Sequence, residues 1–405
     1  MLTYHYVARN SKTGEKISSD VQAESEQVAA KLIRQEGLAP LEITLKDGGG
    51  SGLIARIKNR ISAKDKILFS RQLATLINAG LPLVQSLRSV GDQTDNKAFK
   101  NVINHVISDV EAGTTLSIAL SRHPSVFDQI YISLIAAGET SGTLDKSLER
   151  LALQQEKDAE LLSKVRGAMI YPLIVILVMF AVIGFMIVQV LPQVKVLYEG
   201  MQGAELPLIT KVLLAISDFT IKFWWLVIAM LAFAAFGMSR WARTLGGKQI
   251  VDQLKMKIWP VGPLFMKMYM ARFARTATTL VASGVPLIQV LEITARSINN
   301  VHIEKSIHNA IEKVKGGKSL SESITNDPHF LSLVPDMLKI GEQSGAIEQM
   351  LSKTADYYEK EVDTQVKTIS TIIEPVLMVI LGVVAFIIVA AVLLPIYGLA
   401  GKSVV

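Results

Sequence analysis

Three long apolar segments of this 405-residue chain contain no charged residue: Met169–Leu191, Phe223–Ser239 and Pro375–Ile396. A bilayer core about 30 Å thick requires about 20 helical residues at a rise of 1.5 Å each. We therefore expect three transmembrane helices. Because the middle segment is short, its helix is expected to extend back through Ile209–Thr220. Tryptophans at both ends of this segment favour a membrane span over a buried core helix.

The basic residues around these segments predict the orientation of the chain in the membrane. The second segment is followed by a single acid, Asp252, and by five basic residues: Arg240, Arg243, Lys248, Lys255 and Lys257. Lys and Arg are retained on the cytosolic side. We therefore expect residues 1–168 and 241–373 in the cytosol, and the C-terminus outside it. The net charge of +6 has the same explanation, so no nucleic-acid partner is expected.

The chain contains an internal repeat. Phe69–Leu87 and Phe273–Leu291 are identical at nine of nineteen positions, at an offset of 204. One residue is then lost, and Gly138–Gly142 (Gly-Glu-Thr-Ser-Gly) matches Gly341–Gly345 (Gly-Glu-Gln-Ser-Gly) at an offset of 203. Each copy runs into a membrane segment, the first or the third. The second segment has no counterpart, and we interpret it as the return crossing that two parallel copies require.

Glycine and proline residues predict that each copy is built of helical hairpins. Gly80 and Pro82 stand where one helix ends and the next begins, and Gly284 and Pro286 repeat that arrangement. The Gly-Glu-x-Ser-Gly motif predicts a joint between two helices, in which a Ser or Thr caps the second helix. In the first copy this second helix is expected to run from about Leu144 directly into the membrane.

The N-terminal residues have a different pattern. Tyr4–Ala8, Ile17–Val21 and Leu41–Leu45 resemble short strands, and Ser25–Glu36 resembles a helix. The glycine-rich stretch Asp47–Gly52 is typical of a flexible linker. A small α+β module on a tether is therefore expected.

Together these patterns predict a mainly α, polytopic membrane protein with two repeated cytosolic helical-bundle domains, three transmembrane helices and a small N-terminal α+β module. The expected boundaries are the module 1–46, a linker 47–63, the first helical domain 64–168, a span 169–192, an outer loop 193–218, a span 219–240, a connector 241–267, the second helical domain 268–373, a span 374–396 and a tail 397–405.

Most residue patterns that carry enzymatic chemistry are missing. The chain has no cysteine, and its six histidines form no ligand pair. Gly317–Ser319 and Gly401–Ser403 read Gly-Lys-Ser but lack the preceding glycine of a phosphate-binding loop. The three spans contain no ionisable residue, which argues against an ion pathway. We expect no catalytic residue, no cofactor and no metal site.

Glu139 and Glu342 hold the same position in the two joints. One interpretation is structural, in which each carboxylate caps a helix within its own domain. The other is a charged contact with a basic partner, since the residue recurs in both copies. The sequence leaves both interpretations open.

The chain resembles the inner-membrane platform proteins of type IV pilus assembly and type II secretion, the secretion F family. The resemblance covers essentially the whole chain. It rests on the motifs Phe69–Leu83 and Phe273–Leu287, both Gly-Glu-x-Ser-Gly joints, Tyr171-Pro172, Glu374-Pro375 and Leu206–Thr210. It implies a platform without enzymatic activity that binds a hexameric cytosolic assembly ATPase and lifts pilin or pseudopilin subunits out of the membrane.

The resemblance also implies further partners and the residues that would contact them. The further partners are other inner-membrane assembly proteins, membrane lipid and a second copy of the chain. The spans are expected to meet pilins or another copy of the chain, with Gly184 and Gly382 as close-packing positions. The rival functions are a membrane transporter or channel subunit and a membrane-anchored enzyme. The expected contact residues are Glu139, Ser141, Gly142, Glu342, Ser344, Gly345, Arg71 and Arg275.

Overall fold

The computed structural model describes residues 2–10, 16–23, 26–35, 37–45, 60–193, 196 and 208–400. The described residues divide into two compact units. The first comprises Met1–Lys66 with Gly91–Asn104, and the second comprises Ile67–Val90 with His105–Val405. Each unit is considered by itself.

The first unit begins with the expected α+β module. Strands β1 (Leu2–Asn10), β2 (Lys16–Ala23) and β3 (Leu38–Leu45) form an antiparallel sheet in the order β2-β1-β3, and helix α1 covers Glu26–Gln35. Tyr6 and Ala8 lie two residues apart on β1, so their side chains share one face of the sheet. They pack with Ile33 of α1 in a buried cluster. The expected module is confirmed, and residues 47–59 of the expected linker 47–63 lie outside the described residues.

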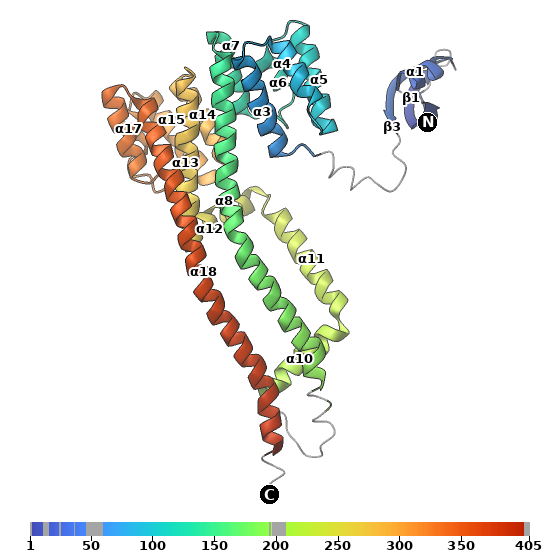
Figure 1. Cartoon of the computed structure of the whole chain (residues 1–405), viewed down its shortest axis with the longest axis vertical. Coiled ribbons are helices and arrows are strands. Elements are labelled where there is room, and N and C mark those ends of the chain that lie inside the picture. The colour runs from blue at the N-terminus through green and yellow to red at the C-terminus, as the bar shows by residue number, and fades with distance from the viewer. Residues whose placement is uncertain are drawn as a thin grey trace. The chain divides into compact units, whose positions relative to one another are not determined.

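The helices of the two repeats follow one another in the same order (Figure 1). The first repeat contains α3 (Ala63–Asn78), α4 (Leu83–Asp92), α5 (Lys97–Glu111), α6 (Leu116–Ser121), α7 (Gln129–Ser141) and α8 (Leu144–Phe185). The second contains α13 (Val261–Ala282), α14 (Leu287–Ile298), α15 (Val301–Lys315), α16 (Leu320–Ile324), α17 (Leu333–Ser344) and α18 (Ile347–Ala400). The one-to-one correspondence supports the duplication seen in the sequence.

Local chain chemistry determines where these helices end. Gly80 and Gly284 have φ angles of 83° and 78°, which an L side chain rarely adopts. At the end of α3, the Gly80 N–H donates to the Ile77 carbonyl at 2.9 Å, and the Leu81 N–H donates to the Leu76 carbonyl at 3.1 Å. The expected glycine helix ends are therefore confirmed.

The last helix of each repeat is long and continuous. Helix α8 has 42 residues and α18 has 54, which correspond to roughly 60 and 80 Å. The expected start of α8 at Leu144 is confirmed. Among the described residues, three helices are long and apolar enough to cross a membrane: Leu144–Gln193, Trp224–Trp241 and Ile347–Ile387.

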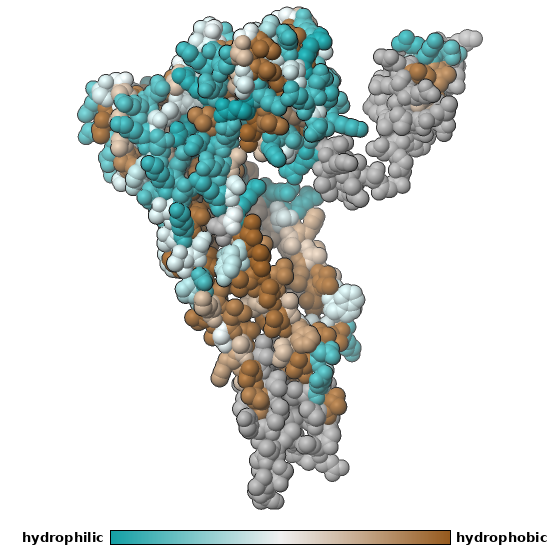
Figure 2. All heavy atoms as spheres, in the orientation of Figure 1, coloured by the Kyte–Doolittle hydropathy of each residue, from teal (hydrophilic) through white to brown (hydrophobic). Residues whose placement is uncertain are grey.

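The apolar parts of these helices face outward. Figure 2 shows hydrophobic surface over the lower halves of α8 and α18, below the polar surface of the helical domains. Among these side chains, Leu177 is 65% and Phe386 is 73% exposed. A soluble protein rarely exposes so many large apolar side chains together, whereas lipid would cover them.

The return segment differs from the expectation. Helices α10 (Leu208–Lys222) and α11 (Trp224–Trp241) are separate, because the chain breaks at Phe223, where φ is −119° and ψ is 30°. The single helix expected from Ile209 onward is thus wrong, although both parts are helical. The Ser217 hydroxyl of α10 donates to the Ile187 carbonyl in the π-helical turn Met186–Val190 that follows α8. This hydrogen bond attaches α10 to the end of the first long helix.

The connector into the second repeat is also helical. Helix α12 (Leu245–Lys257) is capped by Thr244, whose hydroxyl accepts a hydrogen bond from the Gly247 N–H at 3.2 Å. Helix α13 begins at Val261, so the boundary expected at residue 268 falls inside it. The additional turns of α13 lie along α18, where Lys267 pairs with Glu361 at 2.8 Å.

Candidate functional site

The two Gly-Glu-x-Ser-Gly joints lie between a short helix and a long one. Gly142 ends α7 and Gly345 ends α17, with φ angles of 69° and 71°. The first glycine of each joint permits close packing of the two helices. A Cβ atom at Gly138 would lie 2.6 Å from the Ser147 Oγ, and one at Gly341 would lie 2.9 Å from the Ile347 Cα. Each joint therefore requires both of its glycines.

The glutamate of each joint holds the start of a neighbouring helix. The Glu139 carboxylate accepts hydrogen bonds from the Leu116 N–H at 2.5 Å and from the Ser117 N–H at 3.1 Å. Glu342 repeats this arrangement with the N–H groups of Leu320 and Ser321. These N–H groups have no partner within their own helices, α6 and α16. The geometry matches the capping interpretation, and a partner contact stays a prediction.

The serines of the joints are exposed and do not cap the long helices. The Ser141 hydroxyl donates to the Ala137 carbonyl at 2.8 Å, and the Ser344 hydroxyl donates to the Ile340 carbonyl at 2.7 Å. Thr143, the residue before α8, forms no side-chain capping hydrogen bond. The expected Ser or Thr cap at this position is therefore wrong, because the serine hydroxyls bond to the preceding helix turn and the Thr143 hydroxyl bonds to the Ser141 hydroxyl.

The two repeat-equivalent arginines each bind the long helix of their own repeat. Arg71 of α3 donates to both carboxylate oxygens of Glu156 on α8, and these hydrogen bonds lower the pKa of Glu156. Arg275 of α13 donates from Nε to Glu359 at 2.8 Å and from Nη2 to Asp356 at 2.5 Å, both on α18. Burial disfavours the charged form of Arg275, but these hydrogen bonds outweigh it and raise its pKa. Each arginine thus joins the first helix of its domain, α3 or α13, to the long helix of the same repeat, α8 or α18.

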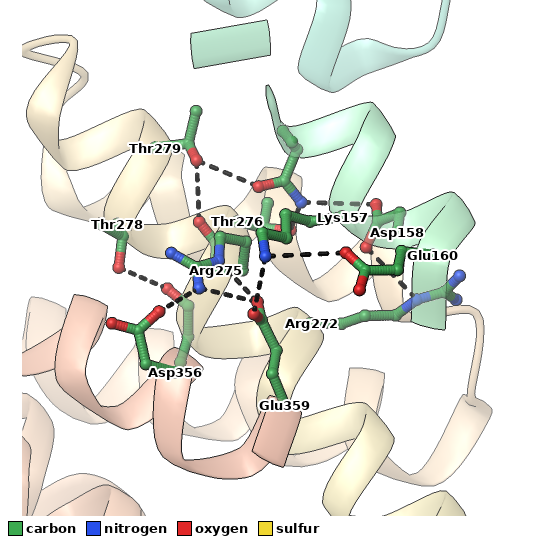
Figure 3. A network of polar contacts seen from close by, with 12 residues as sticks. Lys157, Asp158, Glu160, Arg272, Arg275, Thr276, Thr278, Thr279, Asp356 and Glu359 are labelled. Carbon is green, nitrogen blue, oxygen red and sulfur yellow. Dashed lines mark hydrogen bonds and ion pairs between the residues drawn. The ribbon is translucent and has the colours of Figure 1, made fainter. Parts of the chain in front are cut away.

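A polar network joins the first repeat to the second (Figure 3). The Gln154 amide of α8 donates to the Thr276 hydroxyl at 3.3 Å and accepts from the Thr279 hydroxyl at 3.0 Å, both on α13. Arg272 of α13 lies 3.8 Å from Asp158 of α8, and burial raises the pKa of this carboxyl group. Asp158 and Arg272 both border a cavity of about 290 Å³ between α7, α8, α13 and α14.

Further contacts extend this network along both long helices. The Arg150 guanidinium of α8 donates to the Ala282 carbonyl at the end of α13. Lower down, Lys164 of α8 donates to Asp363 of α18 at 2.7 Å. The polar contacts therefore reach from the joint toward the apolar part of α8, and they connect α8 with α13 and α18.

One family model matches each repeat separately. The model for type II secretion system protein F matches residues 69–192 and again residues 273–395. The chain belongs to the type II secretion system protein F family. The two matched segments begin at Phe69 and Phe273, where the internal repeat begins, so the duplication is confirmed.

The chain is also similar to curated relatives over nearly its full length. It is 39% identical to the type IV pilus assembly protein PilC of Thermus thermophilus, over 99% of both chains. It is 37% identical to PilC of Myxococcus xanthus, over 96% of this chain and 92% of the relative. It is 32% identical to the type II secretion system protein F of Pseudomonas aeruginosa, over 98% and 99%. With its three apolar helices, this protein F family member is an inner-membrane protein.

The eight residues predicted from the family resemblance fall into separate places. In each repeat the joint residues lie just before the long helix, and the arginine binds that helix further along. From Leu144 to Glu156 the distance along α8 is about 18 Å. The structure therefore does not bring all of the predicted residues into one site. In the described residues, no three His, Asp or Glu side chains gather in a metal-binding arrangement.

The sequence patterns did not predict the contacts between the two repeats. The internal repeat does not predict these contacts, because the residues that form them differ between the two copies: Gln154 corresponds to Tyr357, and Arg272 corresponds to Leu68. One signal was available: Arg150, Gln154 and Asp158 recur every four residues and therefore share one face of a helix. A polar stripe at this spacing indicates a second helix with matching polar groups.

Changing the joint glutamates would test the capping role within this protein F family member. We expect Glu139→Ala and Glu342→Ala each to destabilise their domain by about 1.5–3 kcal/mol, because two N–H groups lose a charged acceptor. The thermal unfolding midpoint of the detergent-purified chain measures the effect. Glu312→Ala is the control, since that side chain is 74% exposed and pairs with Lys315 three residues away. A midpoint equal to that of the control would contradict the capping role.

Proposed function

We propose that this protein is the inner-membrane platform of a type IV pilus machine, where it couples a cytosolic assembly ATPase to the extraction and polymerisation of pilin subunits. The observation that carries the proposal is the continuity of α8 and α18. Each helix runs without interruption from a joint in a helical domain into an apolar segment. A displacement of the domain would therefore move the apolar segment directly.

The relatives favour a pilus over a secretion system. Identity is 39% and 37% to two pilus assembly proteins, compared with 32% to a secretion protein of similar length. In a type II secretion machine the same platform would lift pseudopilins. The chain itself would act without a catalytic site, because the ATPase would supply the energy.

The charge distribution supports an orientation for this platform. By the positive-inside rule, the basic residues after α11 favour a cytosolic location for residues 241–373. Residues 1–168 would lie on the same side, and the C-terminus would lie outside the cytosol. Both helical domains would then face a single hexameric ATPase.

The arginine clamps give the coupling a physical basis. Arg71 attaches α3 to α8, and Arg275 attaches α13 to α18, at equivalent positions of the two repeats. A force applied to either domain would therefore reach its long helix through several contacts. The exposed joint residues Ser141 and Ser344 are the places where we propose that the ATPase makes contact.

Affinity purification of the tagged protein from native membranes, after mild crosslinking, tests the proposal. We expect mass spectrometry to recover an assembly ATPase together with pilin-like proteins. The double variant Ser141→Glu/Ser344→Glu is expected to lose the ATPase and to keep the pilin-like proteins, because it changes only exposed joint residues. Pseudopilins in place of pilins would assign the platform to secretion.

The matched control is Asn309→Glu, which adds one acid to an exposed position on α15. It should retain both partners. Recovery of a substrate-binding or transport protein, with neither ATPase nor pilin, would contradict the platform and favour a transporter subunit.

A further inference from the structure

The two repeats of this chain are packed head to tail. Helices α7 and α8 of the first repeat contact α13 of the second, and α7 also contacts α14. At these contacts the first repeat contributes its last two helices, and the second contributes its first two; α8 also contacts α18, the last helix of the second repeat. A two-fold arrangement would instead use the same face of both repeats.

Burial of equivalent side chains confirms this asymmetry. On the last helix of the first repeat, Gln154 is 2% exposed, whereas its counterpart Tyr357 is 49% exposed. On the first helix of the second repeat, Thr279 is 7% exposed, whereas its counterpart Thr75 is exposed. Among the described residues, one copy of each face is covered within the chain, and the other copy is uncovered.

The uncovered faces carry large apolar side chains. Ile340 of α17 is 51% exposed and stands where the first repeat has Ala137. On α3, Leu68 is 52% exposed and stands where the second repeat has Arg272. These side chains belong to the helical domains, above the apolar segments that lipid would cover (Figure 2). Lipid therefore does not account for them.

The uncovered faces also carry the polar groups needed for one contact of the covered interface, that between a cation and the carbonyl end of a helix. Within the chain, Arg150 donates to the Ala282 carbonyl at the C-terminal end of α13. Lys353 is the exposed counterpart of Arg150, and Asn78 at the end of α3 is the counterpart of Ala282. The carbonyl end of a helix attracts a cation. A lysine and a helix end are therefore available for the same contact between two chains.

We propose that α17 and α18 of one chain pack against α3 and the following turn of a second copy of the chain. This contact would repeat the arrangement that joins the two repeats within one chain. Tyr357 would then meet Thr75 of the next copy, as Gln154 meets Thr279. The proposal concerns self-assembly and does not rest on the proposed function.

The direction of the long helices allows the proposed contact to be repeated from one copy to the next. Both α8 and α18 leave their domains in the same direction (Figure 1). Because these two helices run in the same direction, a rotation that superimposes one on the other has its axis parallel to both. Successive copies would therefore lie side by side in the plane of the membrane, in a ring or arc with all apolar segments in the bilayer.

Site-directed crosslinking in native membranes tests the proposal, because the full chain has no cysteine. Thr75→Cys is placed on one tagged copy and Tyr357→Cys on a second copy with a different tag. A short thiol-specific crosslinker is expected to give a two-chain product that carries both tags. Either variant alone is expected to lose this product, since a head-to-tail contact does not bring like positions together.

The matched control pairs Thr75→Cys with Asn309→Cys, an exposed position in the middle of α15. No product above this control would overturn the proposal. Equal products from each single variant with itself would also overturn it, because they would indicate a two-fold contact. All three positions are exposed, so the variants leave the core of the domains unchanged.

Discussion

Arg275→Ala is expected to destabilise the second helical domain by about 3–5 kcal/mol, because it leaves a buried carboxylate without its partner. The side chains of Arg275 and Glu359 are each only 14% exposed. Lys157 lies 3.9 Å from Glu359 and remains as a partial partner, so we expect the lower part of this range. The exposed Asp356 would return to water at little cost.

The first repeat provides the matched comparison. Arg71 and Glu156 form the equivalent pair, but their side chains are 38% and 37% exposed. Solvent screens such a pair, so Arg71→Ala is expected to cost about 1 kcal/mol or less. Thermal unfolding of the detergent-purified full chain, followed for each variant, measures the difference.

A double variant separates the charge effect from the loss of packing. Arg275→Met/Glu359→Met removes both charges and keeps most of the buried volume, so we expect it to recover much of the stability lost in Arg275→Ala. If Arg275→Ala and Arg71→Ala lowered the midpoint equally, burial would not be the reason for the effect.

Gly341→Val is expected to disrupt the joint between α17 and α18, at a cost of about 1–3 kcal/mol from overpacking. The new Cβ would lie 2.9 Å from the Ile347 Cα and 3.3 Å from the Met350 Cβ. The nearest of these atoms belongs to the backbone, which cannot rotate away. The two helices would have to separate, and Glu342 would be pulled from the start of α16.

Gly138→Val should have the same effect in the first repeat, where the Ser147 Cβ would lie 2.7 Å from the added atom. Gly237→Val in α11 is the control, because a Cβ there would meet no atom of the described residues within 4 Å. The measurements are the thermal unfolding midpoint and, under the proposed function, the number of surface pili. A Gly341→Val protein as stable as Gly237→Val would contradict close packing at the joint.

Two glycines of the spans, Gly184 and Gly382, are expected to pack closely against pilin or another copy of the chain. A Cβ at either would meet no atom of the described chain within 4 Å. Within the described residues, neither glycine therefore serves packing. A contact with pilin or with another copy stays a prediction at both positions.

Patterns of short range determined much of this fold from the sequence. Membrane segments, strands and helix ends depend on residues within one or two turns of each other, so Gly80, Leu144 and the N-terminal strands were predicted correctly. The internal repeat extended this knowledge, because one copy predicts the elements of the other. Phe223 was missed because a helix break without glycine or proline has no such local pattern.

Only the tertiary structure decided how the parts contact one another. Arg71 and Glu156 lie 85 residues apart, and Gln154 and Thr279 lie 125 apart, so no local spacing connects them. The role of Glu139 was likewise open until the start of α6 was placed beside it. The repeat made the two domains alike, but it did not determine which face of each would meet the other. That choice depends on side chains that differ between the copies, such as Gln154 and Tyr357, and on the complementary surfaces that form only when both domains have folded.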